Sequence, residues 1–127
     1  MFSHVAVGTN DVETSRTFYD AILAAIGGAP GVVAPDGNRV RYTHDGCILI
    51  VTRPVNGEPA CLGNGMTVGF KVGSPELVEA WHAAGVASGG VSCENPPGER
   101  NGALGRLYLA YLRDPQGNKL CAVHRMG

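Results

Sequence analysis

The spacing of hydrophobic residues predicts a strand followed by an amphipathic helix at the start of the chain. Side chains alternate along residues 2–9, which is typical of a strand. Asn10 can then cap a helix, with Glu13 three residues later as a capping box requires. Apolar residues next recur at helical spacing, at Val12, Phe18, Tyr19, Ile22, Leu23 and Ile26. Because the pair Gly27-Gly28 ends this period, we expect a helix over residues 11–26.

Short strands separated by turn sequences are expected to follow this helix. The strands predicted by alternation and by flanking turn residues are 31–34, 39–43 and 47–52. Residues 35–38 and 44–46 carry the Pro, Asp, Gly and Asn that favour turns. The stretch that comes next is rich in Pro, Gly and Asn and is interpreted as a connecting loop.

The same order of elements then restarts. A strand is predicted over residues 66–72, and Ser74 with Pro75 at the next position is a typical helix start. The apolar spacing favours a helix over residues 75–88, which Gly89 and Gly90 end. The elements expected after it are a strand over 91–93, a loop over 94–105, and strands over 107–113 and 119–124.

The two halves match when residues 4–28 are shifted forward by about 63 positions. Strand falls on strand, and Phe18 falls on Trp81, so both are expected in the core. The pattern predicts an α+β fold of duplicated βαβββ modules that form a curved mixed sheet around a cleft. We expect one domain, 1–127, with module one near 1–53, a linker at 54–64, and module two near 65–127.

Composition narrows the classes of function. With 127 residues, 44% hydrophobic and 17% charged, the chain is expected to fold as one globule. A net charge of −1 without a basic stripe argues against nucleic acid, and no apolar run has the length that a membrane span needs. The start of the chain lacks the features of a signal peptide. Four scattered cysteines, at Cys47, Cys61, Cys93 and Cys121, favour free thiols in the cytoplasm.

Three stretches together resemble the vicinal oxygen chelate superfamily, which includes glyoxalases, bleomycin-resistance proteins and extradiol dioxygenases. The start, with the strand at His4 and the helix that contains residues 15–20, is similar to the start of many members. Residues 63–70 resemble the start of the second module, and residues 112–120 resemble the DPxGN turn before the last strand. The resemblance covers nearly the whole chain, and it implies the duplicated βαβββ fold with a small-molecule cleft.

The resemblance also implies where a divalent metal would be held. The family's ligands would fall at His4, Thr67 and Cys121 and at a position near Leu49. Only His4 carries the expected donor, because threonine is a poor ligand, leucine has no donor atom, and thiolate suits softer metals. We therefore expect no resident cofactor, and a divalent metal at this place is the alternative.

Side chains that would line the cleft are the candidate ligand-binding residues, namely His4, Thr67, Tyr108, Tyr111, Lys119 and Cys121. His4 is either a functional residue or a histidine satisfied within the sheet. Cys121 shares a strand face with Lys119 and is either a cleft thiol or a small buried filler. Tyr108 and Tyr111 alternate, so one of them is expected in the cleft, and core packing is the alternative role.

Three functions remain open from the sequence. The chain is an enzyme of lyase, dioxygenase or isomerase type without the usual metal set, a module that binds a small organic molecule, or a structural or regulatory homodimer. A metal-dependent lyase or dioxygenase of the same superfamily is the further alternative. We expect a homodimer in each case, since the two modules leave sheet edges that need protection. No catalytic residue is assigned.

Overall fold

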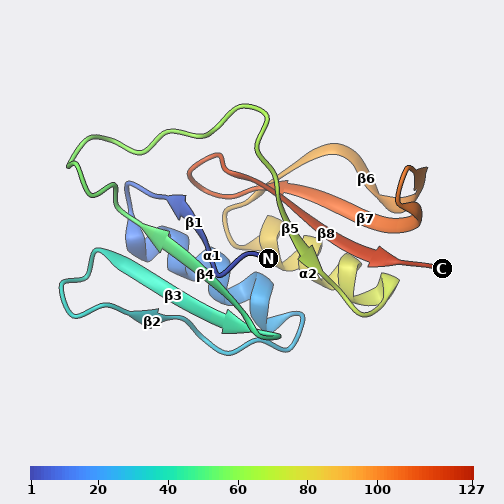
Figure 1. Ribbon diagram of the computed structural model, residues 1–127, viewed down its shortest axis with the longest axis horizontal. Coiled ribbons are helices and arrows are strands. Elements are labelled where there is room, and N and C mark those ends of the chain that lie inside the picture. The colour runs from blue at the N-terminus through green and yellow to red at the C-terminus, as the bar shows by residue number, and fades with distance from the viewer.

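The computed structural model describes all 127 residues and contains two βαβββ modules in succession (Figure 1). The first module consists of β1 (Val5–Gly8), α1 (Val12–Ala24), β2 (Val32–Val33), β3 (Arg39–His44) and β4 (Cys47–Thr52). Its strands form a four-stranded sheet in the order β1-β4-β3-β2, in which β1 and β4 are parallel and the other pairs antiparallel. This is the strand–helix–hairpin arrangement that the hydrophobic pattern predicts.

The second module repeats that arrangement with longer strands. It consists of β5 (Val68–Lys71), α2 (Pro75–Ala87), β6 (Val91–Gly102), β7 (Gly105–Arg113) and β8 (Lys119–Arg125), with sheet order β5-β8-β7-β6. The strand β5 and the helix α2 begin and end 63 positions after β1 and α1. The predicted α+β fold of duplicated modules is therefore confirmed. Residues 53–67 between the modules contain no helix or strand and arch from β4 to β5 (Figure 1).

The two helices begin at matching residues, and one of the predicted caps is wrong. Ser74 caps α2 by accepting a hydrogen bond from the amide of Leu77, as predicted. In α1, however, the cap is Asp11, which accepts from the amide of Thr14 at 3.0 Å. Asn10 is used elsewhere, since its side-chain amide binds both the backbone N–H and the carbonyl of Ala60. Each helix has 13 residues, and neither combines the length and apolarity that a membrane crossing requires.

The expected loop over residues 94–105 is wrong, because β6 continues through most of it. The strand pairs with β7 on both sides of an irregularity that lies between Cys93 and Gly98. Pro96 and Pro97 fall in that irregularity, where no ladder hydrogen bond is needed from a backbone N–H. Glu94 has a positive φ of 57° there, so its backbone departs from the strand path.

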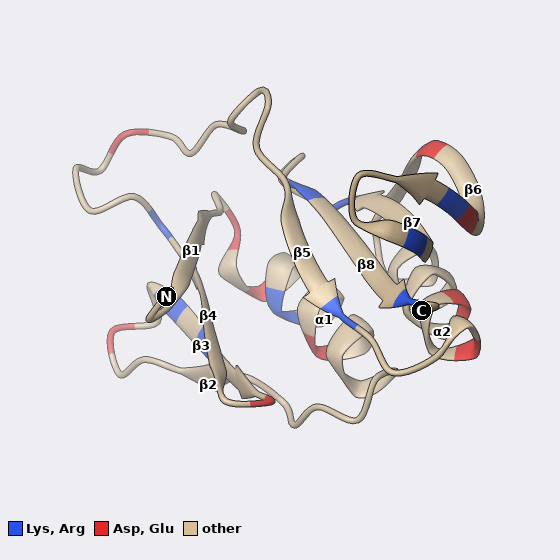
Figure 2. Ribbon diagram, turned by 45° about the vertical axis from the view of Figure 1, so that its right-hand side comes forward, with Lys and Arg blue, Asp and Glu red and all other residues tan.

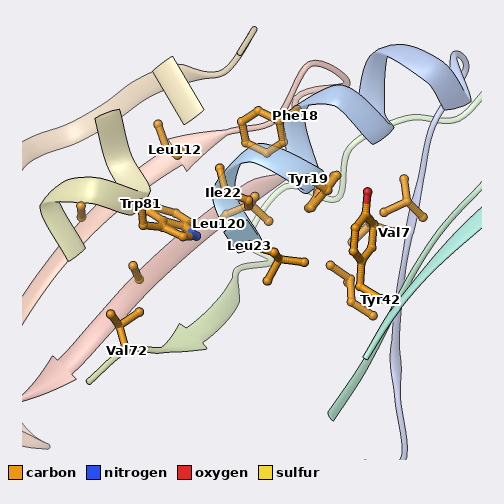
Figure 3. Close-up of a cluster of buried hydrophobic side chains, with 14 of the residues drawn as sticks. Val7, Phe18, Tyr19, Ile22, Leu23, Tyr42, Val72, Trp81, Leu112 and Leu120 are labelled. Atoms are coloured by element: carbon orange, nitrogen blue, oxygen red, sulfur yellow. The ribbon is translucent and has the colours of Figure 1, made fainter. Parts of the chain in front are cut away.

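One core joins the two modules, with α1 between them (Figure 2). The helix α1 packs against β3 and β4 on one side and against α2 on the other, while α2 covers β6, β7 and β8. Figure 3 shows Phe18 and Ile22 of α1 between Tyr42 of the first sheet and Trp81 of α2. Phe18 and Trp81 are fully buried, as predicted.

A glycine in α2 permits this close packing. A Cβ atom on Gly85 would lie 2.3 Å from Leu112 Cδ1 and 3.2 Å from Ile22 Cγ2. Glycine normally weakens a helix interior, but here it lets the helix approach both the sheet beneath it and α1. The residue that weakens the helix locally therefore allows the core to close.

A buried carboxylate ties the last turn of the second module to the first module. Asp114 is 3% exposed and accepts a hydrogen bond of 2.6 Å from the hydroxyl of Tyr19 in α1. It also accepts from the amides of Gln116 and Asn118 and from the Asn118 side chain. The same Asn118 side chain donates to the carbonyl of Gly8 in β1. The DPxGN sequence is thus a structural joint between modules.

Candidate functional site

Three of the predicted ligand-binding residues lie together on one face of the second sheet. Helices cover the other face, so we call this side the outward face and define it by Leu107, Leu109, Tyr111, Lys119, Cys121 and Val123. The register pairs Tyr111 with Cys121 and Leu109 with Val123 across β7 and β8, which puts these side chains on one side. Leu107, Leu109 and Cys121 form a small cluster of their own, separate from the main core.

A cation and an aromatic ring meet on the outward face. The Lys119 ammonium lies 4.9 Å from the centre of the Tyr111 ring, within the range of a cation–π contact. Lys119 also forms an ion pair with Glu94, the residue that the irregularity of β6 turns toward it. This ion pair and the neighbouring tyrosine phenol hold the lysine ammonium over the face, with its side chain 24% exposed.

Cys121 is a protonated thiol at neutral pH. Burial raises its pKa to about 11, and the nearby Glu94 carboxylate adds to the increase. A hydrogen bond with Tyr111 and the charges of Lys119 and Arg100 act in the opposite direction and only partly offset burial. The thiol therefore serves as a small, weakly polar contact and is a poor nucleophile.

Tyr108 does not lie with these residues. It pairs with His124 on the helix-covered side, and its hydroxyl donates to Glu79 of α2 at 2.5 Å. The expectation that one of the two tyrosines shares the Cys121 face therefore selects Tyr111. Strand alternation turns Tyr108 toward α2, so Tyr108 lies apart from Lys119 and Cys121 and its ligand-binding role stays a prediction.

His4 is also separated from Cys121 within the chain, whereas Thr67 lies two residues before Gly69, the register partner of Cys121. His4 is exposed just before β1, where its Nδ1 lies 2.7 Å from the Ser3 hydroxyl, and it lines a cavity of about 260 Å³ between the modules. Thr67 is exposed just before β5. Neither Thr67 nor Cys121 lines that cavity. Tyr111, Lys119 and Cys121 thus form one group with Thr67 beside it just before β5, whereas His4 and Tyr108 lie apart.

No protein-family model matches the chain, and no curated protein sequence matches it. Solved structures do share this arrangement. A crystal structure of a glyoxalase/bleomycin resistance protein from Albidiferax ferrireducens T118 is 56% identical, with a TM-score of 0.94 over 98% of this chain and 99% of that one. The chain belongs to the glyoxalase/bleomycin resistance family.

Solved structures of lower sequence identity support the fold alone. A glyoxalase/bleomycin resistance protein/dioxygenase family enzyme from Burkholderia phytofirmans PsJN is 16% identical, with a TM-score of 0.70 over 96% of each chain. A lactoylglutathione lyase from Agrobacterium tumefaciens is 18% identical, with a TM-score of 0.67 over 98% of this chain and 92% of that one. The fold is therefore shared with proteins that have little sequence in common with this chain.

The metal site that the glyoxalase/bleomycin resistance family suggests does not fit the donors of this chain. No three His, Cys, Asp or Glu side chains gather at one place. Leu49, the fourth expected position, is 8% exposed and packs in the main core on the helix-covered side of β4. Its neighbours Ile48 and Ile50 face the other way and have no donor atoms.

Sequence reasoning missed several residues around the outward face of this family member. A second cavity, of about 550 Å³, lies at the end of β5 and β8, where Leu107 and Val123 adjoin Lys71 and Leu104. Glu94 was missed because it was assigned to a loop. The sequence signal that could have placed Glu94 is the double proline that follows it. Two prolines are compatible with an irregularity in a strand as well as with a loop.

Proposed function

We propose that this protein binds a small organic molecule on the outward face of the second sheet, without a resident metal. The observation that carries the proposal is the joint position of Lys119, Tyr111 and the protonated Cys121 on an apolar sheet surface. A mostly apolar wall with a few convergent polar groups is the usual composition of a ligand site.

The chemistry of this face favours a neutral or weakly anionic ligand with an aromatic part. The Tyr111 ring and the leucines offer an apolar surface on which a ring can pack. Lys119 can hold an acidic group, which competes with Glu94 for the ammonium. Because Cys121 is protonated and donates its weak hydrogen bond to the carbonyl of Ala122, it offers a ligand an uncharged surface that does not repel an anion.

A second copy of the chain is the partner we propose. His4 and Thr67 are the hydrogen-bonding residues expected of the cleft, and within one chain His4 lies in the other module. Pairing the first module of one protomer with the second module of its partner would bring the two sets of residues together. The exposed side chains of Phe2 and Met66, which are 80% and 60% exposed, support such a pairing.

The test is a ligand screen by thermal shift, followed by calorimetric titration of Cys121→Trp against the parent. We expect the bulky indole to weaken the hits by about tenfold or more, while the fold survives. The matched control is Cys61→Trp, since Cys61 is exposed in the segment between the modules. If the hits bind both variants and the parent equally, the outward face is not the ligand site.

A second variant guards against misfolding of the first. Lys119→Met removes the ammonium and keeps most of the stem, and we expect it to weaken acidic hits more than neutral ones. Metal analysis of the protein purified without added metal tests the other half of the proposal. Near-stoichiometric Zn, Ni, Mn or Fe that is lost on His4→Ala would contradict it.

A further inference from the structure

A cavity between the modules has no role in the proposed function. It has a volume of about 260 Å³ and lies between the first sheet and β5, with Leu23 and Ile26 of the α1 end among its walls. Figure 2 shows α1 between the first sheet on one side and β5 and β8 on the other. Ten of its 16 lining residues are hydrophobic, so an occupant would have an apolar body.

The mouth of this cavity carries more cationic and donor groups than acidic ones. Lys71 lines it and forms no ion pair, although it is exposed at the end of β5. His4 and His44 line the same cavity, and Asp45 is the one carboxylate beside them. Phe2, whose side chain is 80% exposed, also borders the cavity.

We propose that this inter-module cavity binds a small aromatic monocarboxylate, with its ring among Leu23, Ile26 and Phe70 and its carboxylate toward Lys71. The volume lies just below the usual range of about 300–1,000 Å³ for ligand pockets, so the occupant has a single ring. The site goes beyond the proposed function, because its apolar walls are Leu23, Ile26 and Ile48 of the first module, although Lys71 borders the cavity of the outward face as well.

The single tryptophan of the chain provides a specific readout. The Trp81 ring lies 5.9 Å from the ring of Phe70, which lines the cavity. Its Nε1–H is buried without a hydrogen-bond partner, and in Figure 3 the indole nitrogen points toward Leu23, another lining residue. A ligand that moves Phe70 or Leu23 changes the surroundings of Trp81, whereas one on the outward face lies across the sheet from it.

The experiment titrates the full-length protein with phenylacetate and follows Trp81 emission, with calorimetry as a second measure. Phenylacetamide has the same ring and no charge. We expect phenylacetate to change the emission and to bind about tenfold more tightly than phenylacetamide, because it gains a charge-assisted contact with Lys71. Equal affinity for the two probes, or no binding of phenylacetate at millimolar concentration, overturns the proposal.

Two substitutions and a control test whether the probes bind in this cavity rather than elsewhere on the protein. Lys71→Met should weaken phenylacetate about tenfold and leave phenylacetamide unchanged. The control Arg41→Met removes one cation from β3, at an exposed residue that does not line the cavity, and should leave both affinities unchanged. Ile48→Phe, which fills the cavity from β4, should weaken both probes. Calorimetric binding without any change of Trp81 emission would place the ligand elsewhere and refute the proposal.

Discussion

Replacing Tyr19 with phenylalanine removes one buried hydrogen bond and almost no volume. The hydroxyl donates to Asp114 at 2.6 Å, and Tyr19 is fully buried while Asp114 is 3% exposed. A hydrogen bond to a charged group contributes about 1.5–3 kcal/mol. Since Asp114 keeps its three bonds within the turn, we expect the free energy of unfolding to fall by about 2 kcal/mol. For a chain of this length that lowers the melting midpoint by about 8 °C.

The assay is thermal and urea unfolding of Tyr19→Phe beside Tyr108→Phe. Tyr108 donates to Glu79 in an exposed hydrogen bond of 2.5 Å, so its substitution should leave the midpoint unchanged. If both variants lose the same stability, burial does not decide how much these hydrogen bonds contribute to the free energy of unfolding, and the reasoning is refuted.

The pH dependence gives an independent check on Tyr19. Burial, reinforced by the Asp114 charge, raises the pKa of Tyr19 well above its ordinary 10.0. A phenol whose pKa is raised by folding stabilises the protein below its unfolded pKa, and that stability is lost as pH rises further. The parent should therefore lose stability above about pH 10 more steeply than Tyr19→Phe does.

Three further predictions concern the core, the thiols and the assembly. Gly85→Ala should lower the melting midpoint, although alanine favours helices, because the added Cβ would meet Leu112. The control Gly69→Ala should leave the midpoint unchanged, because its Cβ would meet nothing within 4 Å. Cys121 should alkylate with iodoacetamide more slowly than the exposed Cys61, and its rate should keep rising with pH until the pH reaches its pKa of about 11. Equal rates at pH 8 would contradict this. Sedimentation at micromolar concentration should give the mass of a dimer, and a monomeric mass would count against the proposed pairing.

Local sequence patterns were sufficient to predict the two helices and the duplication of the module. Helix periods, glycine stops and the repeat at about 63 positions depend on neighbours in sequence, so α1 and α2 were located to within about two residues at each end. The errors at Asn10 and in β6 have tertiary causes. Asn10 holds Ala60 of the distant inter-module segment, and β6 continues past its prolines because β7 supplies a pairing partner.

The candidate site was less predictable, because it depends on how the modules pack. Alternation correctly put Lys119 and Cys121 on one face, but it left open which of Tyr108 and Tyr111 joined them. It also gave no means of knowing that Leu49 faces the core. The family pattern implied that His4 and Cys121 share a cleft, whereas in one chain they belong to sheets on opposite sides of α1 (Figure 2).

The joint between Tyr19 and Asp114 also bears on how the chain matures during translation. The two residues are 95 positions apart, and a ribosome adds about 5–20 residues per second. Roughly 5–20 seconds therefore pass between the synthesis of Tyr19 in α1 and that of Asp114. Until α2 and the second sheet have been synthesised, the face of α1 that packs on the second module, with Phe18 and Ile22, stays uncovered. A nascent chain that stalls before β8 would expose this face and become a substrate for chaperones or a seed for aggregation.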